Sequence, residues 1–253
     1  MINDLYTAKN TRDALKKVKE GYLPFAGGTE IMRLGSEVKC DKFVSLKNCG
    51  LNTIEMGGEF LKIGAMCTFT DLIKSPLVPE GLKQACRFNS SLQKRNMATI
   101  GGNIALHRDD SFLLSTLIAY SAEIELAGAR GTRPLFILED IDYTKEFITY
   151  VYLDPTLKVF SDRVANTEAS HALVTAAVGG SEKGEFIIAC CIKNTSIASM
   201  LSDPNTYTGF TDGLTFSSDV VYGSKEYKRY ITTTTINSLV EKYENAFGGN
   251  NEN

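Results

Sequence analysis

The chain has 253 residues, a hydrophobic fraction of 43%, a charged fraction of 23% and a formal net charge of -3. This composition is that of an ordinary globular protein, and the weak negative charge excludes strong attraction to nucleic acid or to an anionic membrane surface. No apolar stretch has the length of a signal peptide or a membrane span, so we expect a cytoplasmic protein.

The cysteines and histidines do not form a pattern typical of metal binding or nucleophilic catalysis. The sequence has no CxxC pair and no ferredoxin-like spacing. We therefore expect no metal site and no catalytic side chain in this chain, and we interpret the cysteines as small buried hydrophobic residues. The six are Cys40, Cys49, Cys67, Cys86, Cys190 and Cys191.

The first predicted elements are a helix, a strand and a glycine turn. Thr11 is typical of a helix N-cap, and Gly21 stands where a helix commonly ends. Residues 22–26 predict a short buried strand, which leads directly into Gly27-Gly28-Thr29. A second, short helix is expected over residues 30–34.

The middle of the chain predicts strands, then helices, then a second glycine turn. Strands are expected at 43–46, 53–55 and 60–64, with a hairpin turn at Gly57-Gly58. Helices are expected from Thr70 to just before Pro76 and over 82–88, before the turn Thr99 to Asn103.

The second half of the chain alternates between apolar strands and helices. A helix is expected over 111–122 and a final helix with Ile236, Leu239, Val240 and Tyr243 on one face. Because threonine is a poor helix former, residues 232–235 predict that this last helix begins late or depends on packing. The strands are expected at 123–127, 150–153, 172–178 and 186–192, with a turn at 179–184. The fold class is therefore α+β, with a boundary near residue 155.

The two Gly-Gly turns raise a functional hypothesis. Consecutive glycines let several backbone N–H groups point into one concavity, and a helix that follows adds its dipole. Two such turns brought together could grip a pyrophosphate from both sides, whereas each alone is also explained as an ordinary tight turn. Neither turn matches GxGxxG or the P-loop. The residues by themselves leave these alternatives open.

Three segments resemble one known family. PFAGGTEIMRLG, ATIGGNIA and DVVYGSKEYKRYI are similar to motifs of the FAD-binding medium subunit of molybdenum hydroxylases, a family that includes xanthine dehydrogenase, and the chain looks like a short variant. The resemblance implies a two-subdomain FAD-binding fold of the PCMH (vanillyl-alcohol-oxidase-like) type, followed by a smaller α+β domain. The implied domains are 1–154, with subdomains 1–52 and 53–154, then 155–247 and a disordered tail over 248–253.

The same resemblance implies that the two glycine turns clasp the pyrophosphate of a non-covalently bound FAD. One position departs from the family, because Phe112 stands where an aspartate usually bonds the FAD ribose. Either Asp110 substitutes for that aspartate or the cofactor is held less tightly. The residues implied to contact FAD are Phe25, Ala26, Gly27, Gly28, Thr29, Glu30, Thr99, Ile100, Gly101, Gly102, Asn103, Asp110, Ser111, Ile148 and Lys158.

The function implied by the resemblance is electron transfer within a multi-subunit oxidoreductase. Electrons would pass from a [2Fe–2S] small subunit to FAD in this chain, and then to NAD+ or another acceptor. A large subunit carrying molybdopterin would hydroxylate the substrate. Two other hypotheses remain open at this point: a flavin-deficient subunit that supports assembly, and a self-contained FAD-dependent reductase.

Overall fold

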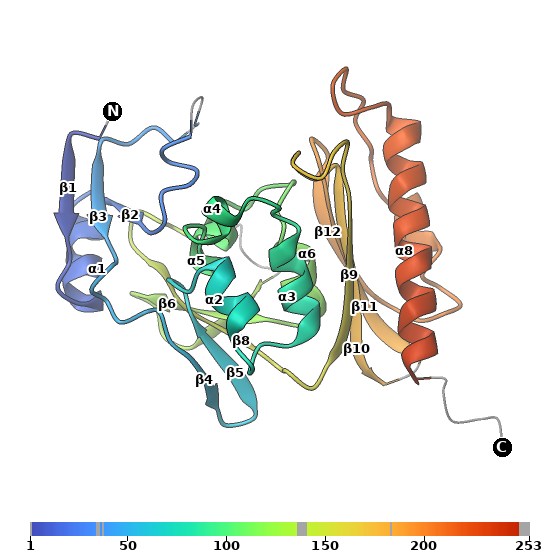
Figure 1. Cartoon of the computed structure of the whole chain (residues 1–253), viewed down its shortest axis with the longest axis horizontal. Helices are drawn as coiled ribbons and strands as arrows, with labels where there is room; N and C mark the ends of the chain where they lie inside the picture. The colour runs from blue at the N-terminus through green and yellow to red at the C-terminus, as the bar shows by residue number, and fades with distance from the viewer. Residues whose placement is uncertain (1, 34–35, 37, 136–140, 183, 248–253) are drawn as a thin grey trace. The chain divides into compact units, whose positions relative to one another are not determined.

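The computed structural model describes residues 2–33, 36, 38–135, 141–182 and 184–247, which form two compact units (Figure 1). The first unit comprises Met1–Leu77, Ser91–Leu106 and Ala122–Leu153, and the second comprises Val78–Ser90, His107–Ser121 and Asp154–Asn253. Each unit is therefore built from separate stretches of the chain, and a single boundary near residue 155 does not describe this division. The division into an FAD-binding domain and a C-terminal domain stays a prediction, and the predicted tail lies outside the described residues.

A small parallel sheet begins the first unit. Within the described residues its strand order is β1-β3-β2, and α1 packs its buried Ala14 and Val18 into the adjacent core. The expected N-cap of α1 is wrong by one residue, because the side chain of Asn10 accepts the hydrogen bond from the amide of Asp13. The elements are β1 (Asp4–Thr7), α1 (Thr11–Lys19), β2 (Leu23–Phe25) and β3 (Lys42–Ser45).

An antiparallel sheet and three short helices complete the first unit. The strand order among the described residues is β4-β5-β8-β6-β7. The predicted subdomain boundary between residues 52 and 53 lies between the two sheets of this unit, although its meaning as a domain boundary is not tested. The elements are β4 (Ile54–Gly57), β5 (Phe60–Gly64), α2 (Phe69–Lys74), α4 (Leu92–Arg95), α5 (Ile100–Ala105), β6 (Glu123–Ala127), β7 (Thr132–Pro134) and β8 (Phe147–Leu153).

The second unit is an antiparallel sheet covered by helices on both faces (Figure 1). Its strand order within the described part of the chain is β12-β11-β10-β9. Val174, Ala176 and Val178 of β10 join the core that α8 covers, whereas Thr175 between them bonds towards α6 on the other face. The elements are α3 (Glu80–Arg87), α6 (Leu114–Ala119), β9 (Lys158–Val164), β10 (Val174–Glu182), β11 (Glu185–Ile192), β12 (Ser196–Ser202), α7 (Gly209–Asp212) and α8 (Lys225–Phe247).

Packing overrides local sequence preference in this unit. The expected turn at 179–184 is wrong for residues 179–182, because β10 continues to Glu182. Gly179 lies within that strand. Glycine is needed at this position because a Cβ would lie 2.8 Å from the carbonyl oxygen of Ala119, the last residue of α6. The final helix runs unbroken through its threonines, and the hydroxyls of Thr232 and Thr235 donate to the carbonyls one turn earlier.

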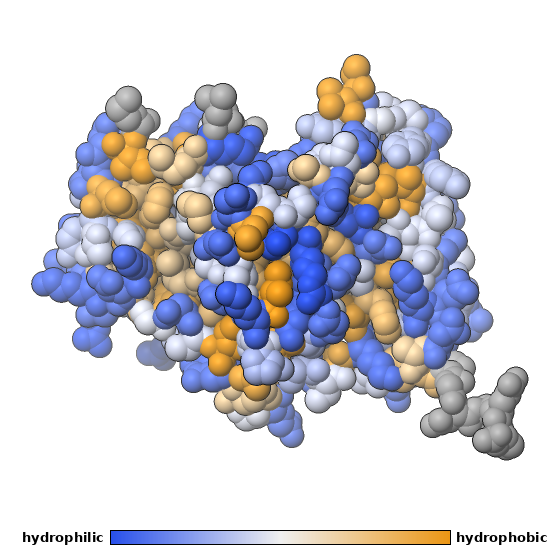
Figure 2. All heavy atoms as spheres, viewed as in Figure 1, coloured by the Kyte–Doolittle hydropathy of each residue, from blue (hydrophilic) through white to orange (hydrophobic). Residues whose placement is uncertain are grey.

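The described helices include none that is both long and apolar enough to cross a membrane. The predicted cytoplasmic location does not follow from this and stays a prediction. Figure 2 shows hydrophilic residues over much of the visible face, with smaller apolar areas between them. Large apolar side chains that are exposed include Leu201, Val220 and Val221 of the second unit.

Candidate functional site

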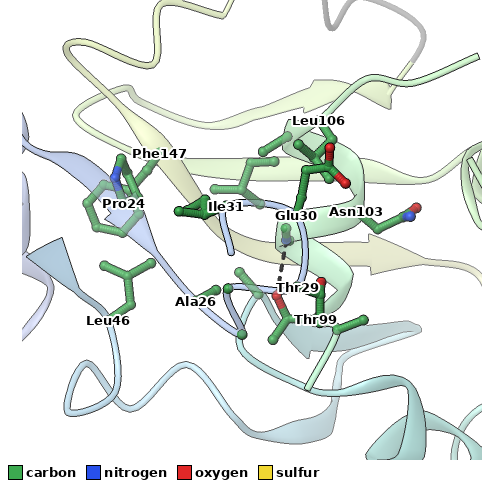
Figure 3. Close-up of a pocket in the computed structure, with 18 of the residues that line it drawn as sticks. Pro24, Ala26, Thr29, Glu30, Ile31, Leu46, Thr99, Asn103, Leu106 and Phe147 are labelled. Atoms are coloured by element: carbon green, nitrogen blue, oxygen red, sulfur yellow. Dashed lines mark hydrogen bonds between the residues drawn. The ribbon is translucent and has the colours of Figure 1, made fainter. Parts of the chain in front are cut away.

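A pocket of about 310 Å³ lies within the first unit, and both glycine motifs contribute to its walls (Figure 3). Pro24, Leu46 and Phe147 gather on one side of the view in Figure 3, whereas Thr29, Thr99 and Asn103 lie on the other. The pocket therefore has an apolar part and a part rich in hydrogen-bonding groups. This size and composition suit a small-molecule ligand.

Gly27 brings the two motifs together. A Cβ atom at this position would lie 1.6 Å from the carbonyl oxygen of Met97, which is an impossible contact. Only glycine therefore allows the loop after β2 to rest against the backbone that precedes α5. Gly28 has a different role, because its φ of +68° is a left-handed conformation.

The second motif is a helix start and not only a turn. The Thr99 hydroxyl caps α5 by accepting a hydrogen bond from the Gly102 amide at 3.1 Å. Gly101 packs against Ala65, whose Cβ would be 2.6 Å from an added Cβ, so this glycine serves helix packing. Gly102 faces the pocket, and in the described structure a Cβ there meets only the Thr99 hydroxyl, at 3.0 Å.

The amides of the two motifs differ in what they can offer a ligand. The Ile100 amide donates to Cys67, the Gly101 amide donates to Ala65, and the Gly102 amide is used by the Thr99 cap. The interpretation that this motif presents free amides to a phosphate is therefore wrong for residues 100–102. By contrast, within the described part of the chain the amides of residues 27–29 have no protein acceptor. These amides are donors available to an anion.

Glu30 does not cap a helix. Residues 30–33 form turns, so the short helix predicted there is wrong over the described residues, and its last residue, Leu34, lies outside them. The Glu30 carboxylate pairs with Arg33, with 2.6 Å between Oε1 and Nη2. This ion pair fixes the end of the loop that carries the glycines.

The structure brings together ten of the residues predicted to bind a cofactor. The lining of the pocket includes Ala26, Gly27, Gly28, Thr29, Glu30, Thr99, Gly101, Gly102, Asn103 and Ile148. Phe25 instead packs edge-on against Phe43, with ring centroids 6.0 Å apart, and Ile100 is fully buried.

The other three predicted residues, Asp110, Ser111 and Lys158, belong to the second unit, so a role for them at this pocket stays a prediction. Ser111 lies just before α6, and its hydroxyl accepts hydrogen bonds from the amides of Leu113 and Leu114. Lys158 donates to the Ala246 carbonyl at 2.8 Å, near the end of α8.

Asp110 is the centre of a buried charge cluster. Its carboxylate receives two hydrogen bonds from Arg108, at 2.7 and 2.9 Å, and a third from Lys193, while His171 lies 3.6 Å away. Burial raises the pKa of Asp110, but the hydrogen bonds and charges of Arg108 and Lys193 outweigh it and lower the pKa to about 2. Asp110 is thus ionised at neutral pH and pairs with Arg108 and Lys193 within the second unit.

Sequence reasoning missed Tyr143, which also lines the pocket. Its hydroxyl is buried and, among the described residues, has no hydrogen-bond partner. No local motif identifies this tyrosine, because only the tertiary structure decides which side chains line a pocket.

Comparison with known proteins gives a family and a fold. Residues 2–147 match the family described as the FAD binding domain in molybdopterin dehydrogenase. YgfM, an uncharacterized protein of Escherichia coli K12, is 24% identical over 251 residues, which span 94% of this chain and 95% of that protein. The putative xanthine dehydrogenase FAD-binding subunit XdhB of the same strain is 31% identical over 119 residues, which span 43% of this chain and 39% of XdhB.

Two solved structures have the same fold. A chain of quinoline 2-oxidoreductase from Pseudomonas putida 86 aligns with a TM-score of 0.79 at 20% identity, covering 96% of this chain and 98% of the other. A chain of carbon monoxide dehydrogenase from Hydrogenophaga pseudoflava aligns with a TM-score of 0.79 at 18% identity, covering 96% of each. The predicted α+β fold of the PCMH type, with its C-terminal domain, is confirmed.

The roles of the helix glycines can be separated by mutation. We expect Gly102→Val to lower FAD affinity by at least about tenfold with little change in the unfolding midpoint, because the side chain occupies the pocket. Gly101→Val should instead lower stability, by about 1–3 kcal/mol, because it collides with Ala65. Flavin fluorescence titration and thermal unfolding measure the two effects. A folded Gly102→Val variant with wild-type FAD affinity would contradict this placement of the ligand.

The Asp110 cluster predicts acid-sensitive stability. Since the folded pKa of about 2 lies below the value of about 3.9 in an unfolded chain, the ion pairs stabilise fully above about pH 4 and less as pH falls towards 2. The pH-dependent part is about 2 kcal/mol. Asp110→Ala should cost about 3–5 kcal/mol at neutral pH, because it strands the buried Lys193 amine.

Urea unfolding at neutral and acid pH measures this contribution. The matched control is Asp212→Ala, which removes an exposed ion pair with Arg229 and should cost less than about 1 kcal/mol. Equal losses in the two variants would show that the buried cluster contributes no more than a surface pair.

Proposed function

This chain belongs to the family of FAD-binding domains in molybdopterin dehydrogenases, and we propose that it holds FAD to carry electrons between an iron–sulfur subunit and a final acceptor. The match of residues 2–147 confirms the predicted family. The chain is an oxidoreductase subunit, the FAD-binding subunit of a molybdenum hydroxylase complex. The electron path, the acceptor, the partners' cofactors and the contacts to FAD are the proposed part.

The residues of the pocket fit FAD on three observations. The amides of residues 27–29 lack protein acceptors within the described structure and suit a pyrophosphate. Gly102 leaves open the space that a side chain would fill. The apolar walls near Leu46 and Phe147 suit a planar ring. One observation carries the proposal: residues 27–29, whose amides have no protein acceptor among the described residues, line the same pocket as apolar side chains of the first unit.

The chain's own contribution is binding and orientation. Gly27 fixes the separation of the two motifs, the first loop supplies backbone donors, and the Thr99 hydroxyl, whose oxygen already accepts from Gly102, keeps its hydrogen for donation. When bound, FAD supplies the redox chemistry that links one-electron partners to a two-electron acceptor such as NAD+. No side chain of the pocket has to act as an acid or a base.

The proposed partners are a [2Fe–2S] small subunit and a molybdopterin-binding large subunit. One structure with the same fold is that of a carbon monoxide dehydrogenase that lacks the Mo-pyranopterin moiety of its molybdenum cofactor. The exposed apolar side chains Leu201, Val220, Val221 and Tyr230 offer surface that a partner chain could bury. We propose a xanthine dehydrogenase-like complex, located in the cytoplasm, on the partial similarity to XdhB.

One observation favours the alternative of a flavin-deficient assembly subunit. Asp110, the proposed substitute for the usual ribose-binding aspartate, is already engaged by Arg108 and Lys193. Phe112, at the usual position of that aspartate, stacks on His171 with ring centroids 5.8 Å apart. If FAD needs this bond, the chain would bind it poorly.

The experiment that decides between the two is an FAD titration of the purified full chain. We expect binding with a 1:1 end point, and reduction of the bound flavin when the chain is reconstituted with its iron–sulfur and molybdenum partners and a purine substrate. The isolated chain with substrate alone should show no reduction, because the hydroxylating site lies elsewhere. A folded chain that leaves the flavin spectrum unchanged would support the assembly role and overturn the proposal.

A further inference from the structure

Tyr143 lines the pocket, and its hydroxyl is a polar group without a protein partner among the described residues. It is buried, and no hydrogen-bond partner exists for it in the described part of the chain. Other buried or half-buried tyrosines of this protein do find acceptors: Tyr152 donates to the Glu125 carboxylate at 2.6 Å, and Tyr243 to the Glu182 carbonyl at 2.6 Å. Because an unpaired buried hydroxyl is costly, a hydrogen bond from this group to a ligand would stabilise the complex.

The surroundings of Tyr143 define what that partner can be. Burial, and then the charge of Glu146, raise the pKa of Tyr143, so its phenol stays protonated at neutral pH and can donate. Phe147 and Ile148, which follow in the chain, line the same pocket, and no lysine or arginine belongs to its described lining. A neutral donor among apolar groups suits a ring carbonyl or ring nitrogen better than a phosphate, for which the amides of residues 27–29 are available.

We propose that the Tyr143 hydroxyl donates a hydrogen bond to an acceptor on a planar heteroaromatic ring of the bound dinucleotide, and so selects ligands that carry such an acceptor. This inference rests on the proposed function, since FAD supplies the ring. FAD contains two rings with suitable acceptors, the flavin and the adenine. Both present carbonyl or nitrogen lone pairs at the edge of a flat apolar surface, which is the chemistry that this part of the pocket recognises.

Replacing the hydroxyl separates ligand binding from folding. Tyr143→Phe should weaken FAD binding by about tenfold, measured by flavin fluorescence titration, because one buried hydrogen bond is lost from the complex. The ligand-free variant should unfold at the same temperature as wild type or a higher one, because the substitution removes an unsatisfied group. These two shifts in opposite directions are not expected of a merely structural tyrosine.

Tyr152→Phe is the matched control. It removes a phenol that already has a protein partner, in the same unit, at a residue outside the pocket lining. We expect this variant to lose stability without ligand and to keep wild-type FAD affinity. If Tyr143→Phe behaves in the same way as Tyr152→Phe, the proposal is overturned.

Titration with riboflavin and with adenosine identifies the ring. A loss of affinity in Tyr143→Phe for one of the two assigns the hydrogen bond to the flavin or to the adenine, respectively, and supports the proposal. A loss for FAD with neither fragment affected would place the hydroxyl at the pyrophosphate and overturn it. If wild type binds FAD and folded Tyr143→Phe binds it equally well, only this inference fails, whereas a wild-type chain without FAD affinity overturns the proposed function together with it.

Discussion

The pocket of the first unit depends on the contact between Gly27 and the Met97 carbonyl. The loop after β2 and the segment before α5 are about 70 residues apart in the sequence, and they touch at a position that has no room for a Cβ. Backbone against backbone is the closest packing that two segments can reach. It places the donors of one motif and the helix start of the other on the walls of a single pocket.

The two glycine pairs look alike in sequence but have different structural roles. In the first pair, Gly27 permits the close contact and Gly28 adopts a left-handed conformation, which together leave amides available to a ligand. In the second pair, Gly101 lets α5 approach Ala65, while Gly102 keeps the pocket open. Among the described residues, the pocket therefore has amides without a protein acceptor on one wall and the Thr99 hydroxyl on another.

The second unit depends on the packing of helices against the two faces of its sheet. The strand β10 is buried from Val174 to Gly179 between helices on its two faces, and the contacts on those two faces differ in kind. On one side the contact is largely apolar, through Leu239, Val240 and their neighbours on α8. On the other side polar groups meet, as where Thr175 donates to the Ser111 carbonyl at 2.9 Å. The charge cluster at Asp110 extends this polar contact into the segment that follows α5.

The sequence by itself determined the features that are local or strongly patterned. Three features could be recognised without coordinates: the two glycine motifs, the strands before and after Gly184, and the apolar face of α8 at Ile236, Leu239, Val240 and Tyr243. The motifs in their order were also enough to indicate the family, because their spacing reflects a whole binding site and not one turn.

Only the tertiary structure decided the rest, because these features depend on which groups come together in space. It showed that Gly179 lies within a strand, where a helix carbonyl comes close, and that the amides of residues 100–102 are already used. It placed residues 78–90 and 107–121 with the C-terminal part of the chain. It also revealed the buried hydroxyl of Tyr143, since no pattern along a chain records whether a polar atom has found a partner.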